Sequence, residues 1–438
     1  MDKISESGYR WALVYVITLA MIGFFTASDQ EIVQGFAKIM VCNNVLISDY
    51  FEIVGIGATF VNVAIVTLVT IALMYFNNTP MNGMGIITLG LMSGFSFFGK
   101  NIFNMWFIIG GTYLYCFVKK EKFSRHILVS LLSTSLSPLI SSTFFSNGIT
   151  LKGICVSIIC GLIIGFVMPM LAAHTDKLLH GLNLYNGGFA IGLLALVMVP
   201  VLKSYGFDFV PVNYWSTGHN IELSLLLYGT SCCLIFSGFC MDMENALKNY
   251  RNILKRPGLP SQDFTVLDGM GAVLINIGIN GIVGTSYILL IGGDLNGPTI
   301  AGILAVMGFG AKGKHIKNII PVMIGVAIGG ITKQWSPTEP SAQLAALFGT
   351  ALAPVAGTYG FFPGIVAGFI HSSVVLQAGL GYSGVNLYNN GFAAGITSIV
   401  LYPVLAKFIQ PNTYSDPSPS MVMTKFMKIA NTIEEKEK

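Results

Sequence analysis

The chain has 438 residues, of which 53% are hydrophobic and 10% charged, with a formal net charge of +4. Soluble globular domains carry about 25% charged residues, so this composition excludes an ordinary soluble enzyme or binding module. The modest charge fits basic residues gathered on cytoplasmic loops and gives no reason to expect a nucleic-acid partner. The seven cysteines lack metal-like spacing and are expected to be small buried hydrophobes, so neither a metal nor a cofactor is expected.

Apolar runs follow one another from the N-terminus to residue 204 and then recur in the second half. Each is near the roughly 20 residues that cross a bilayer as a helix. We therefore predict an all-α polytopic integral membrane protein in contact with lipid. The first half holds about seven such runs: 11–27, 52–76, 80–98, 101–118, 126–146, 152–173 and 187–204.

An internal duplication organises the chain. The box Gly-Leu-Asn-Leu-Tyr-Asn-Gly-Gly-Phe at 181–189 returns as Gly-Val-Asn-Leu-Tyr-Asn-Asn-Gly-Phe at 384–392, an offset of 203. Asn82-Gly83 returns as Asn296-Gly297 at an offset of 214, and the order of all matches is preserved. Such self-similarity indicates a repeat architecture. We expect a first membrane repeat at 1–212, a second at 213–410 and a cytoplasmic tail at 411–438.

Loop charge indicates how the two repeats are oriented. The segment 119–125 is strongly basic, whereas its counterpart 333–340 has one lysine and one glutamate. Conversely, 248–256 is basic in the second repeat, whereas its counterpart 28–50 has three acids and one lysine. Basic loops stay in the cytoplasm, so equivalent loops are expected on opposite faces. This predicts inverted-topology repeats, an odd number of crossings in each and both termini in the cytoplasm.

Two segments of each repeat are ambiguous between full spans and re-entrant helices. Residues 80–98 and 187–204 each begin with an Asn/Gly-rich box, which disfavours a helix interior. Counting both as spans gives seven crossings per repeat, and counting both as re-entrant gives five. Either number is odd, but if only one segment were re-entrant the parity would fail.

The Asn/Gly boxes are the candidate substrate pathway. Broken backbone is tolerated at membrane depth only where protein buries it or a polar cavity is lined, and matching breaks in inverted repeats indicate a transport site. The alternative is a pair of interfacial turns with tyrosine headgroup anchors. The pathway candidates are Asn82, Gly83, Asn183, Tyr185, Asn186, Asn296, Gly297, Asn386, Tyr388 and Asn389.

Charged residues within the apolar runs are scarce. Lys100 and Lys314 are duplicated, and they either snorkel to the interface or attract anions at two symmetric vestibules. Asp268 and Glu222 are not duplicated and are candidate proton or cation sites. Asp49 and Asp263 are duplicated at the start of a span, where an N-terminal helix cap is the favoured interpretation. His371, in an apolar run, is a further candidate to face a pathway.

The whole chain resembles an uncharacterised bacterial membrane-protein family known by a duplicated domain of unknown function, which implies the bacterial inner membrane. Shorter motifs are similar to those of urea transporters: the box at 78–83 and the box at 181–186, with 295–299 and 384–389 in the second half. That resemblance implies a related scaffold. Neither of the first boxes has Asn directly before Pro, and the boxes are spaced more widely, which places urea itself in doubt.

The sequence therefore predicts a channel or transporter for a small polar solute, such as urea, or an ion. A passive pore lined by amides and a secondary transporter coupled to H⁺ or Na⁺ remain alternatives, as does a non-transporting membrane scaffold. No HExxH, GxSxG or P-loop motif is present, so no enzyme is expected. Assembly as a homo-oligomer is compatible with the Gly-rich helix faces.

Overall fold

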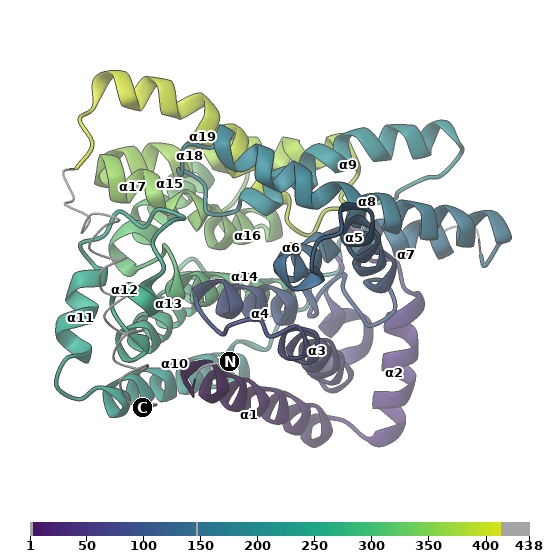
Figure 1. Ribbon diagram of the computed structural model, residues 1–438, viewed down its shortest axis with the longest axis horizontal. Coiled ribbons are helices and arrows are strands. Elements are labelled where there is room, and N and C mark those ends of the chain that lie inside the picture. The colour runs from purple at the N-terminus through teal and green to yellow at the C-terminus, as the bar shows by residue number, and fades with distance from the viewer. Residues whose placement is uncertain (1–2, 146–147, 413–438) are drawn as a thin grey trace.

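The computed structural model describes residues 3–145 and 148–412, which form helices and connecting loops without a β-strand in those ranges (Figure 1). Within them, nine helices are long and apolar enough to cross a membrane. The prediction of an all-α polytopic membrane protein is confirmed. The predicted tail at 411–438 lies outside the described residues, apart from residues 411 and 412.

Each half of the chain contains the same succession of helices. The first has α1 (Lys3–Thr26), α2 (Asp29–Val41), α3 (Tyr50–Phe76), α4 (Gly83–Phe95), α5 (Trp106–Lys119), α6 (Ile127–Ser133), α7 (Ser137–Phe145), α8 (Leu151–Leu178) and α9 (Asn186–Ser204). The second has α10 (Asn220–Met241), α11 (Ala246–Ile253), α12 (Phe264–Leu267), α13 (Met270–Leu290), α14 (Gly297–Gly308), α15 (Ile316–Thr332), α16 (Pro340–Gly349), α17 (Ala353–Tyr359), α18 (Phe361–Ala378) and α19 (Asn389–Phe408).

The match between the halves extends to a backbone break. Gly55 interrupts α3 with a φ of 80°, and Gly269, 214 residues later, separates α12 from α13 with a φ of 87°. Residues other than glycine rarely adopt such φ angles. The pair α12 and α13 is therefore the counterpart of the kinked helix α3.

Helices α4 and α14 lie side by side at the centre of the molecule (Figure 1). A Cβ added at Gly94 would lie 3.2 Å from the Cα atom of Ala301, and one at Gly308 would lie 3.5 Å from the Cα atom of Ile87. At the offset of 214, Gly94 corresponds to Gly308 and Ile87 to Ala301, so each contact is the repeat counterpart of the other. The later residue of α4 contacts the earlier residue of α14, so the two equivalent helices are antiparallel.

The same relationship holds where α9 crosses α19. A Cβ added at Gly192 would meet the Phe392 ring, and one at Gly395 would meet the Phe189 ring. These contacts are also images of each other, here at the offset of 203. Since α9 and α19 are both long enough to span and run antiparallel, a pseudo-two-fold axis relates two repeats of inverted topology.

Of the two ambiguous segments, the one at 187–204 is a full-length helix, α9, and the one at 80–98 is not. Helix α4 has 13 residues and α5 has 14, so each is about 20 Å long, short of the roughly 30 Å hydrocarbon core. The first repeat then keeps five long crossings: α1, α3, the α6–α7 unit, α8 and α9. The expectation that the run 101–118 crosses the membrane is wrong, because α5 is too short and pairs with α4. The number of crossings therefore stays odd even though only one of the two ambiguous segments is re-entrant.

Packing shows that this pair enters and leaves on one side. Early in the α6–α7 unit, Thr134 contacts Met92 of α4. Later in the unit, the Ser141 hydroxyl accepts a hydrogen bond from Asn44, just before α3. The unit therefore runs toward the start of α3. Helix α8 returns beside α7. Helix α5 runs parallel to α8, with Phe107 against Gly161 and Tyr115 against Phe166. Helix α5 therefore ends on the side where α3 ends and α4 begins, so α4 and α5 form a re-entrant hairpin.

Candidate functional site

The N-terminal ends of α9 and α19 meet at the pseudo-two-fold axis. A Cβ added at Gly188 would lie 3.0 Å from the Cα atom of Gly391, so no side chain separates the two backbones. The residues just before these helices, Tyr185 and Tyr388, are buried with ring centroids 4.7 Å apart. The two copies of the tyrosine box thus form one site, and neither tyrosine is a headgroup anchor.

Two lysines and two phenylalanines complete this central cluster. The Nζ atom of Lys314 donates a 2.5 Å hydrogen bond to the Tyr185 hydroxyl and lies 5.0 Å from the Phe309 ring centroid. The Nζ atom of Lys100 lies 5.3 Å from the Phe95 ring centroid and 3.1 Å from the Met92 sulfur. The Phe309 and Phe95 rings in turn contact Tyr185 and Tyr388, respectively.

Both lysine side chains are completely buried. Snorkelling to the interface, one of the two alternatives, therefore does not describe either residue. Neither amine belongs to an ion pair with any residue in the described ranges. Because burial of an unpaired charge in a protein interior is costly, these two amines are the most unusual feature of the site.

An asparagine from the neighbouring long helix holds each lysine segment in place. The Asn62 amide donates to the carbonyl oxygens of Ser96 and Lys100 at 2.8 and 3.0 Å. The Asn276 amide donates to those of Gly310 and Lys314, both at 2.7 Å. These bonds satisfy carbonyls at the end of each short helix and in the turn that follows it, where the lysine stands. The segments that carry the lysines are therefore rigidly attached to α3 and α13.

Asn82 and Asn296 cap the helices that follow them. The Asn82 side chain accepts from the Gly85 N–H at 3.2 Å, and the Asn296 side chain accepts from the Thr299 N–H at 3.1 Å. The Asn296 amide also donates to the Ser216 carbonyl oxygen. These amides begin α4 and α14, in the way that asparagine caps helices generally, and lie away from the tyrosine cluster.

Gly83 and Gly297 allow a carboxylate of the opposite repeat to approach. The Gly83 N–H donates to Asp263 at 3.1 Å, and a Cβ added at Gly297 would lie 2.5 Å from an Asp49 oxygen. Both aspartates also cap their own helices, Asp49 through the Phe51 N–H and Asp263 through the Thr265 N–H. The interpretation of both residues as caps is therefore confirmed, and it extends across the repeat interface.

The remaining asparagines of the tyrosine boxes bind backbone. Asn186 donates to the Ala172 carbonyl oxygen at 2.9 Å and Asn389 to that of Val375 at 3.2 Å, so each anchors its helix to the preceding one. Asn183 accepts from the Tyr185 N–H and donates to the Gly391 carbonyl oxygen. Asn386 accepts from the Tyr388 N–H. The Asn386 amide nitrogen is buried and makes no hydrogen bond of normal geometry to a described residue.

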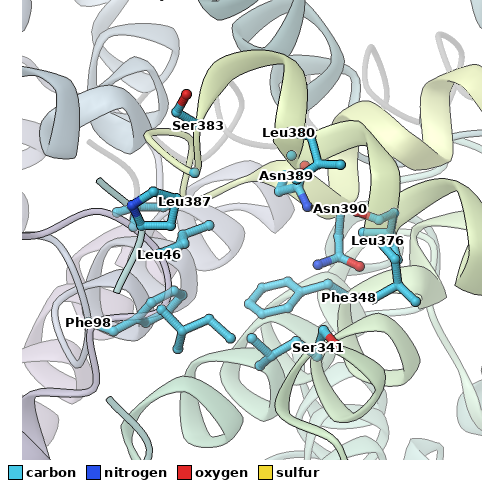
Figure 2. Close-up of a pocket in the computed structure, with 16 residues that line it drawn as sticks. Leu46, Phe98, Ser341, Phe348, Leu376, Leu380, Ser383, Leu387, Asn389 and Asn390 are labelled. Carbon is cyan, nitrogen blue, oxygen red and sulfur yellow. Dashed lines mark hydrogen bonds between the residues drawn. The ribbon is translucent and has the colours of Figure 1, made fainter. Parts of the chain in front are cut away.

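A cavity of about 300 Å³ lies between the repeats, beside this cluster. Figure 2 shows Asn389 and Asn390 on one wall, facing Leu46 and Phe98 of the first repeat across the open space. Phe348 also lines the cavity and stacks on Phe95 with centroids 6.2 Å apart. Since Phe95 contacts Lys100, these two rings stand between the cavity and the buried amine. We call this cavity the vestibule.

The other charged candidates lie apart from the cluster. Asp268 receives two hydrogen bonds from Arg256, at 2.8 and 3.0 Å, in a buried ion pair. Glu222 is exposed in the first turn of α10. The buried His371 ring is hydrogen-bonded to Asn390 at 3.1 Å, so it borders the vestibule through that partner.

Sequence reasoning missed Phe95, Phe309, Asn62 and Asn276 as members of the site. All four occur as duplicated pairs at the offset of 214. The duplication itself could have indicated these residues. A residue kept in both repeats near the pseudo-two-fold axis lies close to the residues that surround its counterpart. Restricting the candidates to the Asn/Gly boxes beside helix breaks left out the two phenylalanines and the two asparagines on the neighbouring helices.

The fold and site define an all-α polytopic membrane protein of two inverted repeats, with a buried aromatic and lysine cluster at their interface. The chain belongs to the family described as "Protein of unknown function (DUF1576)", whose model matches residues 28–204 and 242–407. The two matched stretches correspond to the two repeats, which confirms the predicted membership of an uncharacterised family with a duplicated domain. No curated protein and no solved structure matches the chain.

Proposed function

We propose that this protein transports a small polar solute or an ion across the bacterial inner membrane, through the interface of its two repeats. The observation that carries the proposal is the cluster of Lys100, Lys314, Tyr185 and Tyr388, which is buried at the pseudo-two-fold axis. Ionisable residues inside a membrane protein commonly mark substrate or ion pathways. Inverted repeats with short re-entrant helices bind their substrates at the repeat interface.

Energetics favour a functional rather than a structural role for the lysines. An apolar side chain of similar length would pack against Phe95 or Phe309 without desolvating an amine. A membrane scaffold gains nothing from two unpaired amines at its centre. A transporter gains a site that its solute completes, so the scaffold is the weaker alternative.

The arrangement favours a secondary transporter over an open pore. The Phe95 and Phe348 rings separate the vestibule from Lys100, and the Tyr185 and Tyr388 rings close the axis itself. Movement of one repeat relative to the other would expose the cluster to each face in turn, as in alternating access. Coupling to H⁺ or Na⁺ is compatible with this movement, and a passive path for urea is the competing mechanism.

Loop charge indicates which face of the protein is cytoplasmic, and so which way the vestibule opens. With the repeats inverted, the basic segments 119–125 and 248–256 share one face, which we propose is cytoplasmic, together with both termini. The vestibule is bordered by Leu46 and Pro211, which adjoin the loops of the opposite face. The conformation described is therefore proposed to face outward.

The test is solute flux into proteoliposomes that contain the purified full-length protein. The panel comprises urea, chloride, nitrate, formate and acetate, each with and without imposed H⁺ and Na⁺ gradients. We expect saturable uptake of at least one member, above that of protein-free liposomes. Folded protein, verified by a cooperative thermal transition after reconstitution, that moves none of them under any gradient would contradict the proposal.

A further inference from the structure

We infer that the central cluster is a receptor for one small monovalent anion, an inorganic ion or a short carboxylate, held between Lys100 and Lys314. This inference deepens the proposed function, on which it rests, by naming the class of solute. It rests on three observations: charge balance, an excess of hydrogen-bond donors and the geometry of two helix ends.

The two amines of the cluster would have no countercharge if both were protonated. Both amines are buried, and their contacts in the described ranges are a hydroxyl, a thioether and aromatic rings. None of these groups carries a negative charge. The faces of the aromatic rings attract cations only weakly. A bound anion would supply the countercharge that the protein itself does not provide.

The hydrogen-bonding groups point to the same class of ligand. The buried Asn386 amide nitrogen, beside Tyr388, lies near the Tyr382 hydroxyl but makes no hydrogen bond of normal geometry to a described residue. Its counterpart in the first repeat, Asn183, donates to the Gly391 carbonyl oxygen at 3.2 Å. The donor inventory at the axis thus includes two amines and one unpaired amide. Three unpaired acceptors, the Oδ1 atoms of Asn62, Asn276 and Asn280, are also buried, but they are neutral and do not offset two amines.

Helix ends add positive potential at the same place. Helices α9 and α19 begin directly after Tyr185 and Tyr388, and neither has a side-chain cap. The free N–H groups and the dipole of a helix N-terminus favour an anion. Two such termini meet here at Gly188 and Gly391. This distinguishes them from the N-termini of α4 and α14, where Asp263 and Asp49 already supply the negative charge.

The size of the site limits the anion. The vestibule has a volume of about 300 Å³ and is lined by Phe348, whose ring stacks on Phe95. These two rings must move aside before a solute from the vestibule reaches Lys100, so we limit the proposed anion to a few non-hydrogen atoms.

The test measures thermal unfolding of the purified full-length protein at constant ionic strength. Sodium chloride, nitrate, formate and acetate are each exchanged against the sodium salt of a bulky sulfonate buffer. We expect at least one small anion to raise the unfolding temperature saturably by about 4 °C or more. In Lys100→Met and Lys314→Met this increase should be lost, while their unfolding temperature without anion equals or exceeds that of the wild type.

The matched control is Lys152→Met. The Lys152 amine also lies over a phenylalanine ring, 5.1 Å from the Phe207 centroid, and donates to the Tyr205 carbonyl oxygen, but at an exposed position. This variant should keep the full response to anions. If the methionine variants fail to fold, Tyr185→Phe removes only the hydroxyl that Lys314 contacts, and it should weaken the apparent anion affinity several-fold.

The inference would be overturned if no small anion stabilises the wild type saturably, or if Lys100→Met, Lys314→Met and Tyr185→Phe respond as the wild type does. A parallel titration exchanges sodium chloride for choline chloride. Stabilisation by sodium over choline, with no difference between anions, would indicate a cation site instead and would also overturn the inference. These outcomes are distinct from failure of the proposed function. Saturable urea flux without anion binding would contradict only the inference of an anion site. Anion binding without flux of any solute would contradict only the proposed transport function.

Discussion

Asp263 in the second repeat accepts a 3.1 Å hydrogen bond from the N–H of Gly83, the first residue of helix α4 in the first repeat. Asp49 in the first repeat stands in the same relationship to Gly297, the first residue of α14. Each repeat therefore supplies the carboxylate that complements the positive N-terminus of the other's re-entrant helix. Because α4 and α14 are antiparallel, the two contacts lie at opposite ends of the helix pair. A rocking motion can loosen one while it keeps the other.

Replacing Asp263 with alanine should lower stability. The change removes caps of α4 and α12 together, and the loss of a helix cap costs about 1 kcal/mol. We expect a reduction of roughly 1–2 kcal/mol in the free energy of unfolding, measured by thermal or denaturant unfolding in detergent. Asp208→Ala, at an exposed loop position, is the control. Equal stability of the two variants would contradict a cross-repeat role for Asp263.

The crossing of α9 and α19 gives a prediction with an adjacent control. A Cβ at Gly188 would lie 2.9 Å from the Tyr388 ring and 3.0 Å from the Cα atom of Gly391, whereas one at Gly187 would have no neighbour within 4 Å. Gly188→Ala should therefore separate the two tyrosines, destabilise the protein and reduce flux. Gly187→Ala should be neutral or slightly stabilising, since alanine favours a helix. Unfolding temperature and solute uptake are measured for both, and equal behaviour would argue against the close crossing.

The sequence predicted the repeats well because their shared residues carry backbone constraints. Gly55 and Gly269 both hold a positive φ, and Asn62 and Asn276 make the equivalent pair of backbone hydrogen bonds. Such constraints preserve residue type through duplication, so the spacing remains visible. Loop charge then indicated the inversion that the antiparallel helices display.

The roles of individual side chains were harder to predict. An asparagine beside a helix break can cap that helix or face a solute, and the sequence does not show where its hydrogen bonds lead. Asn82 proved to be a cap. For Lys100, the choice between the interface and the interior depended on how deeply α4 inserts, which is set by its contact with α14 at Gly90 and Gly94. For Asp268, the buried partner Arg256 could not be inferred from a separation of 12 residues.

Asn186 and Asn389 are predicted to matter for both stability and transport. Leucine at either position removes the amide that holds α9 to Ala172, or α19 to Val375. Each substitution also removes the acceptor of a side-chain hydroxyl, that of Thr175 for Asn186 and that of Tyr382 for Asn389, at a cost of about 1–3 kcal/mol. We expect a lower unfolding temperature together with reduced flux. Lost flux at unchanged stability would instead place these amides on the solute path, and unchanged flux would remove them from the site.

Inversion itself can be tested by the accessibility of two serines in cells. Ser124 lies in the basic loop after α5, and Ser336 lies in the equivalent loop after α15, both exposed. Four of the native cysteines are exposed rather than buried as expected, so the single-cysteine variants Ser124→Cys and Ser336→Cys are made in a background without native cysteines. A membrane-impermeant maleimide should label position 336 in intact cells and position 124 only after lysis, since the basic loop is expected in the cytoplasm. The reversed pattern would keep the inverted repeats and exchange the two faces. Labelling of both positions in intact cells, or of neither, would contradict the inverted topology, because equivalent loops of inverted repeats cannot share a face.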